Sequence, residues 1–302
     1  KSNKIETNLI EDSDVLENSF NLNLYSNNFS IDLNTTVYEN LNKIKSDRYE
    51  YIYPQLNLTK KIETNKDING NIYLKSQSIV RNYNTNMYDR NNVNDLVFNS
   101  YPKITKSGLF NNYEFLIRNV NMNNQNSDYK NNGSMSLSSI FQFNSLLPMT
   151  KENNLYKKNL ISKLSLKVAP NHTKNLSNDD DKIDINNVYS LNRISDNQAT
   201  EGGISITYGS DYSISKKEEN REVFNFKWAS NQRFSENEDL PNRNQIGEKT
   251  SNFFSEISYA PIKYLNTKYR TSLRNNLNDQ VYENLITEIK VNNFVTTFDY
   301  LN

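Results

Sequence analysis

Apolar and polar residues alternate with a period of two along much of the chain, and this alternation limits the possible folds more than any other feature. In residues 204–214 the even positions hold isoleucine or tyrosine, except Ser210, and the odd positions hold small or polar residues. Successive side chains of a β-strand point to opposite faces of its sheet. The pattern therefore predicts strands with one apolar and one polar face. Residues 264–275, 285–291 and 294–300 repeat it.

Composition favours strands over helices. Of the 302 residues, 56 are Asn and only 4 are Ala, and Ala is the best helix former whereas Asn is among the poorer ones. The 20 Tyr and 14 Phe favour strands. Less regular alternation predicts ten further strands at about 19–26, 29–40, 48–60, 70–82, 93–104, 108–120, 133–146, 156–169, 222–235 and 251–260, and it extends the strand at 204–214 to about 200–216.

The linkers between these segments are rich in Asn, Asp, Ser and Lys, as turns require. The longest cover about 170–199 and 235–250. No shift in composition marks a domain boundary, so we predict a single domain over residues 1–302.

The way such strands bury their apolar face decides the fold class. A soluble sandwich pairs two apolar faces and uses strands of about 5–6 residues, whereas segments such as 29–40 are longer. A membrane barrel turns its apolar face to lipid and its polar face to water, with strands of about 9–11 residues. We therefore predict an all-β, antiparallel transmembrane β-barrel with up-and-down topology, and a soluble all-β protein is the alternative.

Charge and reactive residues exclude several functions. The 35 basic residues balance the 35 acidic ones, which argues against a nucleic-acid partner. Cysteine is absent and His172 is the single histidine, so cysteine-based zinc sites, thiol nucleophiles and histidine-rich metal sites are excluded. Asp179-Asp180-Asp181 lacks the spacing and glycine of a calcium loop. We read His172 and the aspartates as solvated loop residues, and predict no catalytic, metal or cofactor site.

Membrane and targeting signals are also limited. No run of about 18 apolar residues occurs, so no transmembrane helix is expected. The N-terminal residues 1–4 have no apolar stretch behind them, which disfavours a signal peptide. The chain is therefore expected to be an internal fragment or a processed chain.

Lys268, Arg270 and Arg274 form a basic stripe on one strand, which is either a solvated face or, in a lumen, a contact for an anionic headgroup.

Short motifs in the second half of the chain occur in the order of a known family. Residues 188–203 lead through Leu191-Asn192-Arg193-Ile194-Ser195 to Glu201-Gly202-Gly203. This segment resembles the LPS-assembly protein family (LptD), although Ile194 and Asp196 stand where that family usually has Phe and Gly. The later motifs are Asn231-Gln232-Arg233-Phe234, Glu238-Asp239-Leu240-Pro241, 245–252, Ser258-Tyr259-Ala260-Pro261 and 269–273, and the upstream ones are Tyr53-Pro54-Gln55-Leu56 and 144–149.

The resemblance covers about residues 47–302 and implies a function. It implies the barrel of the translocon that inserts lipopolysaccharide into the outer leaflet of the outer membrane, and not an enzyme. The implied partners are lipopolysaccharide, a plug lipoprotein resembling LptE, a periplasmic bridge protein and outer-membrane lipids. The polar strand faces, including Lys268, Arg270, Glu288 and Lys290, would line the lumen.

We do not expect the family's N-terminal periplasmic domain in this chain. The family's barrels approach about 26 strands, and only about 14 segments fit here, so we expect an incomplete, open barrel whose first and last strands are poorly paired with each other. Two other functions remain open. One is a general porin with a charged constriction. The other is a soluble β-sandwich that binds carbohydrate or hydrolyses glycans, with two carboxylates about 5–9 Å apart.

Overall fold

The computed structural model describes residues 14–44, 47–64, 68–83, 87–125, 133–170 and 174–302. His172 lies outside these residues. The described chain is all β, with one short 3-10 helix, Asn242–Asn244. Its strands are β1 (Val15–Ser26), β2 (Phe29–Asn40), β3 (Tyr49–Ile62), β4 (Gly70–Tyr83), β5 (Met87–Ser100), β6 (Lys103–Ile104), β7 (Phe110–Gln125), β8 (Ser134–Glu152), β9 (Tyr156–Ala169), β10 (Gly203–Lys216), β11 (Arg221–Arg233), β12 (Phe253–Ile262), β13 (Leu265–Leu273), β14 (Gln280–Val291) and β15 (Phe294–Leu301).

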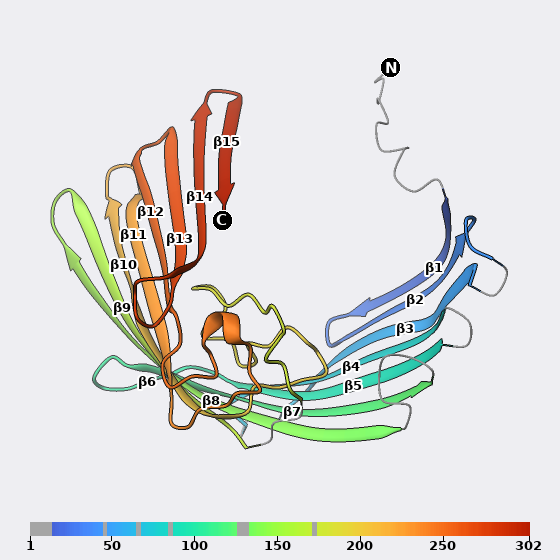
Figure 1. Cartoon of the computed structure of the whole chain (residues 1–302). Helices are drawn as coiled ribbons and strands as arrows, with labels where there is room; N and C mark the ends of the chain where they lie inside the picture. The colour runs from blue at the N-terminus through green and yellow to red at the C-terminus, as the bar shows by residue number, and fades with distance from the viewer. Residues whose placement is uncertain (1–13, 45–46, 65–67, 84–86, 126–132, 171–173) are drawn as a thin grey trace. The chain divides into compact units, whose positions relative to one another are not determined.

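The strands form a single antiparallel sheet in chain order, with the short β6 paired to β7 at its side (Figure 1). The predicted antiparallel meander is thus confirmed. Within the described residues, β1 pairs only with β2 and β15 only with β14. A meander of this kind follows from the sequence because each alternating segment is followed by turn-forming residues that return the chain beside it.

Strand boundaries differ from the predicted ones where polar residues enter the ladders. β5 begins at Met87 rather than at 93, β8 continues to Glu152, and β14 begins at Gln280 rather than at 285. The added segments contain Asn, Asp, Lys or Glu, which the sequence pattern assigned to turns. Backbone pairing with a neighbouring strand overrides these weak preferences. The predicted strand 93–104 is divided, since β5 ends at Ser100 and Lys103–Ile104 form the separate short strand β6.

The chain divides into two compact units. Unit 1 comprises Lys1–Phe98 and Ile117–Leu137, and unit 2 comprises Asn99–Leu116 and Ser138–Asn302. In unit 1, exposed apolar side chains such as Phe20, Leu22 and Leu24 share one face of β1.

The two faces of the sheet in unit 2 have opposite chemistry. On the face that we call polar, β8 to β14 bury polar side chains: Ser138, Gln142, Ser165, Lys167, Ser205, Thr207, Asn231, Arg233, Glu256, Ser272 and Asn284. On the other, apolar face, large hydrophobic side chains are exposed: Phe141, Leu164, Ile204, Ile257, Tyr259, Ile289, Phe298 and Tyr300. The sheet therefore buries its polar face and exposes its apolar one, the reverse of a soluble sheet.

The predicted alternation of β13 holds in the register, whereas Arg274 of the predicted basic stripe lies beyond the strand, which ends at Leu273. Arg270 lies opposite Glu256 and Lys268 lies opposite Ser258, so both cations are on the polar face. Leu265 and Tyr269 occupy the intervening positions of the same strand and belong to the apolar face.

Two long connections cover the polar face. Residues 174–202 join β9 to β10, and residues 234–252 join β11 to β12; we call them together the cap. They lie side by side, since Leu176 N–H donates to Asp239 O at 2.7 Å and Asn242 N–H donates to Ser177 O at 3.3 Å (Figure 1). A small apolar core within the cap, which includes Leu176, Val188 and Ile246, packs on Ala229 and Phe254 of the sheet. Among the described residues, no helix is long and apolar enough to cross a membrane.

Candidate functional site: a charge cluster beneath the cap

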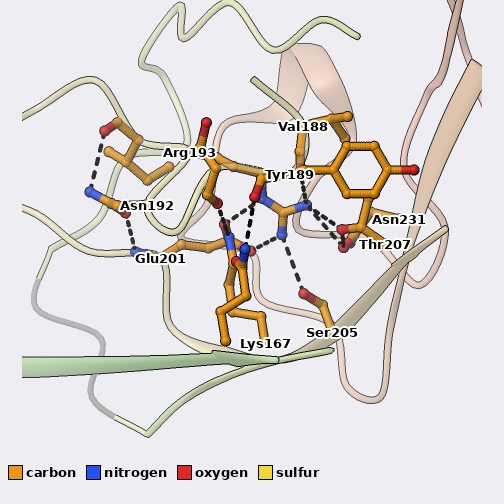
Figure 2. A network of polar contacts seen from close by, with 12 residues as sticks. Lys167, Val188, Tyr189, Asn192, Arg193, Glu201, Ser205, Thr207 and Asn231 are labelled. Atoms are coloured by element: carbon orange, nitrogen blue, oxygen red, sulfur yellow. Dashed lines mark hydrogen bonds and ion pairs between the residues drawn. The ribbon is translucent and has the colours of Figure 1, made fainter. Parts of the chain in front are cut away.

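Four charged side chains meet where the cap rests on the polar face. Glu201 and Arg193 come from the cap and Lys167 comes from β9 (Figure 2). Arg233 comes from β11, and we call the four residues the charge cluster. All four are buried, with side chains 0–4% exposed. Lys167 and Arg233 both lie opposite Ser205 of β10, on its two sides, so the register brings these two cations together.

Glu201 is the common partner of the three cations. Its Oε2 accepts hydrogen bonds from Arg193 Nε at 2.6 Å and from Lys167 Nζ at 3.1 Å. Its Oε1 accepts from Arg193 Nη2 and from Arg233 Nη1, the latter at 3.2 Å. A bidentate guanidinium–carboxylate pair fixes both distance and orientation, so Glu201 holds the cap in a defined position on the sheet.

The donors that Glu201 does not use are satisfied by uncharged oxygens. Arg193 Nη1 donates to Asn231 Oδ1 at 3.0 Å and to Thr207 Oγ1 at 3.3 Å, and Lys167 Nζ donates to Ser190 O at 2.9 Å. Arg233 also donates to Gly202 O. Buried charges need such partners, because an unsatisfied one would carry a large desolvation penalty.

Burial and the neighbouring basic side chains together set the ionisation of Glu201. Burial opposes its charge, but the charges of Arg193 and Lys167 and the hydrogen bond from Arg193 outweigh burial and hold the pKa of this carboxyl well below its ordinary value. Glu201 is therefore an anion at neutral pH. The two guanidinium groups of Arg193 and Arg233 outnumber this single carboxylate, so the cluster carries a net positive charge beneath the cap.

Glycine is required at the join between cap and sheet. Gly203 has φ +96°, a left-handed conformation that favours glycine. A Cβ at this position would overlap the Arg233 guanidinium. Gly202-Gly203, which the sequence shows as an isolated pair, thus makes room for one of the cluster's cations.

A second contact fixes the edge of the cap. The hydroxyl of Tyr189 lies 2.6 Å from where a Cβ of Gly209 would be, so the missing side chain on β10 accommodates the ring. Lys163 Nζ lies 5.6 Å from the ring centroid and pairs with Asp211 at 2.5 Å. Burial, with a smaller contribution from Asp211, raises the pKa of Tyr189, so it stays neutral.

A row of alternating charges crosses the polar face beside the cap. Asp211, Lys227, Glu256 and Arg270 lie directly opposite one another on successive strands β10 to β13. Glu256, whose side chain is 3% exposed, accepts from Lys227 at 3.0 Å and from Arg270 at 2.6 Å. The row places fixed charges of both signs on a surface that a polar solute would contact.

The acidic triplet has a structural role in the cap. Asp180 pairs with Arg243 at 2.5 Å, and Asp181 accepts from Ser195 N at 3.1 Å. Asp181 is buried, so the reading of an exposed triplet is wrong for this residue. Within the described ranges, no group of three or more His, Cys, Asp or Glu side chains could hold a metal.

Most of the residues of the charge cluster stand in motifs that the sequence shows, but the sequence does not indicate that their side chains contact one another. Arg193, Glu201 and Arg233 stand within the family-like segments, whereas Lys167 was not singled out. The available signal was the row Ser165, Lys167, Ala169, a polar or small face ending at the first long linker. A comparison of the chain with protein-family models gives no match, and a search of curated proteins gives none either.

Proposed function

We propose that this chain is an outer-membrane β-barrel protein that passes lipopolysaccharide toward the outer leaflet, as in the translocon it resembles. The observation that carries the proposal is the inverted sheet of unit 2, with polar side chains buried beneath its own cap and large apolar side chains exposed. An exposed apolar surface of this extent marks contact with a membrane or a partner. Lipid is the simplest partner for a face that runs along many adjacent strands.

An amphipathic substrate suits both faces. Its sugar and phosphate groups would stay on the polar face, beside the charge row, while its acyl chains would leave toward the lipid side. No bond is formed or broken in such a passage, so the protein acts by non-covalent guidance and not as an enzyme. In this view the cap closes the polar path when no substrate is present.

The connections between strands suggest an orientation. In unit 2 the turns 153–155, 217–220, 263–264 and 292–293 are short, and the opposite strand ends carry the long cap segments. Outer-membrane barrels have short periplasmic turns and longer extracellular loops. We therefore place the short turns at the periplasm and the cap toward the cell surface. The plug lipoprotein and the periplasmic bridge protein are proposed as partners because the family resemblance implies them.

A general porin is the second candidate, and the charge row of Asp211, Lys227, Glu256 and Arg270 favours it. Charged rings of this kind select ions in open channels. The cap argues for the translocon, because it covers polar side chains of the sheet that an open channel would expose to water. The soluble sandwich is less favoured, since the described strands form one sheet and the apolar face has no second sheet on it.

A photo-cross-linking experiment tests the proposal. A photoreactive amino acid is placed at Asn159, on the polar face of β9, or at its neighbour Leu160, on the apolar face. In Gram-negative cells, position 159 should form an adduct with lipopolysaccharide and position 160 should capture phospholipid. A protein that gives no lipopolysaccharide adduct at 159 but a steady ion conductance in planar bilayers would instead be a porin.

A further inference from the structure

A groove on the polar face at the short-turn end has no role in the charge cluster. It has a volume of about 380 Å³, and its ionisable lining residues are Arg221, Lys263, Lys268, Lys290, Glu222 and Glu288. Four of these are cationic and two are acidic, so the lining carries an excess of positive charge. The groove lies between β11 and β14, and all of its lining residues belong to unit 2.

The cations of the groove differ in whether they already have a hydrogen-bond or ion-pair partner. Arg221 pairs with Glu219 at 3.0 Å and donates to two backbone carbonyls, and Lys290 pairs with Glu288 at 2.7 Å. Lys268 forms no hydrogen bond or ion pair with any residue that the structure describes. The two acids diagonal to it on the neighbouring strands are already paired, Glu256 with Lys227 and Arg270, and Glu288 with Lys290.

A second ammonium stands at the rim. Lys263, in the turn between β12 and β13, lies over the ring of Tyr264 with its Nζ 4.7 Å from the centroid. It forms no ion pair among the described residues, and it is itself one of the residues that line the groove. Two ammonium groups without a carboxylate partner around a small groove suit a compact oxyanion with several acceptor oxygens.

We propose that this groove binds the phosphate group of an anionic amphiphile, with Lys268 and Lys263 as direct ligands. Arg221 and Lys290, already paired, contribute positive potential and do not need to contact the ligand. The position at the short-turn end would make the groove the place where a phosphorylated lipid first meets the polar face. That placement rests on the proposed function, whereas binding of phosphate by the groove does not.

Binding is measured by titration calorimetry on the protein solubilised in a neutral alkyl maltoside. The probes are dodecyl phosphate and inorganic phosphate. The test variants are Lys268→Gln and the double variant K263Q/K268Q. The matched control is Lys158→Gln, which removes an exposed lysine from the opposite face of β9 near the same end of the sheet.

Dodecyl phosphate should bind the parent protein and the Lys158→Gln control equally, and bind K263Q/K268Q about tenfold more weakly, as expected for lost charge-assisted hydrogen bonds. The affinity should fall as salt is raised, because the groove is open to solvent. If inorganic phosphate shows the same loss, the groove recognises the anion itself. If only dodecyl phosphate binds, the amphiphile is the source of the phosphate.

Equal affinity in all variants, or no binding of either probe by the parent protein, would overturn the proposal. Unchanged strand content by circular dichroism shows that the variants are folded. A groove that binds no phosphate would not prevent a lipopolysaccharide adduct at position 159. The titration and the cross-linking therefore test the two proposals separately.

Discussion

Among the described residues, Glu201 is the single carboxylate partner of three buried basic side chains, so its replacement should strongly reduce the stability of the protein. Glu201→Gln keeps the shape of the side chain but leaves Arg193, Lys167 and Arg233 without a counter-ion. Breaking a buried ion pair in this way costs about 3–5 kcal/mol. Thermal unfolding in detergent should therefore shift strongly downward.

The control for this variant is Glu219→Gln in the turn between β10 and β11. Glu219 also has two cationic partners, Lys216 and Arg221, but it is exposed to solvent. Its replacement should change the unfolding temperature little, since exposed pairs contribute little. Equal effects of the two variants would show that the cap is not held by the cluster.

The depressed pKa of Glu201 also predicts a dependence on pH. The ordinary pKa is 4.5 and the folded value lies below it, so the unfolded state binds the proton more tightly. The stabilisation from Glu201 is therefore complete above about pH 4.5 and is lost as the pH falls further. Hydrogen exchange of the cap amides, compared between pH 6 and pH 3, should show selective loss of protection in the cap. The Glu201→Gln protein should lack this acid-induced difference.

Glycine at position 203 serves both backbone and packing. Gly203→Ala would place a residue with a side chain at φ +96° and push it against Arg233. We expect a loss of about 1–3 kcal/mol from the backbone alone, and a further loss from the displaced guanidinium. Gly108→Ala is a suitable comparison, because Gly108 has φ +82° with no atom within 4 Å of the added Cβ. Unfolding temperatures should fall for both variants and fall further for Gly203→Ala.

Among the structural elements, the strands could be predicted from the sequence and the cap could not. Alternation in 204–214 fixes which side chains share a face, because period two is a local property of a strand. The charge cluster depends on four positions spread from Lys167 to Arg233, and it forms only because β9, β10 and β11 pair in one register. The cap segments show no periodicity, so the pattern indicated only long linkers there.

The charge row offers a test of this register at the level of paired strands. Reversing Lys227 to Glu places three carboxylates in a row with Asp211 and Glu256, and reversing Glu256 to Lys places three cations in a row with Arg270. The double variant K227E/E256K restores the central pair but leaves Asp211 beside a glutamate and Arg270 beside a lysine. It should recover only part of the lost stability, with a coupling of about 0.5–3 kcal/mol in a double-mutant cycle. Full recovery would mean that Arg270 does not share Glu256.

On the scale of the whole molecule, the cap and the sheet meet through buried polar contacts as well as through the apolar core that packs on Ala229 and Phe254. At this interface Gln142 Oε1, Tyr189 Oη and Asn231 Nδ2 are buried without a hydrogen-bond partner within the described residues. Buried groups of this kind are usually satisfied, so the interface is less completely matched than a protein core.

The surroundings of the apolar face distinguish a membrane protein from a soluble one. Ile257 lies on that face and is 39% exposed, while Asn266 is exposed on the polar face opposite Glu288. If the apolar face contacts lipid, Ile257→Lys should cost about 2–4 kcal/mol near the bilayer centre, and Asn266→Lys should cost almost nothing. In a soluble protein both positions meet water, and both changes would stay within about 0.5 kcal/mol. The measurement is the urea-dependent folding of each variant into lipid vesicles. A large loss for Ile257→Lys alone supports the membrane barrel, whereas similar small effects would favour the soluble all-β protein, because only lipid makes a lysine costly at a position that is already exposed.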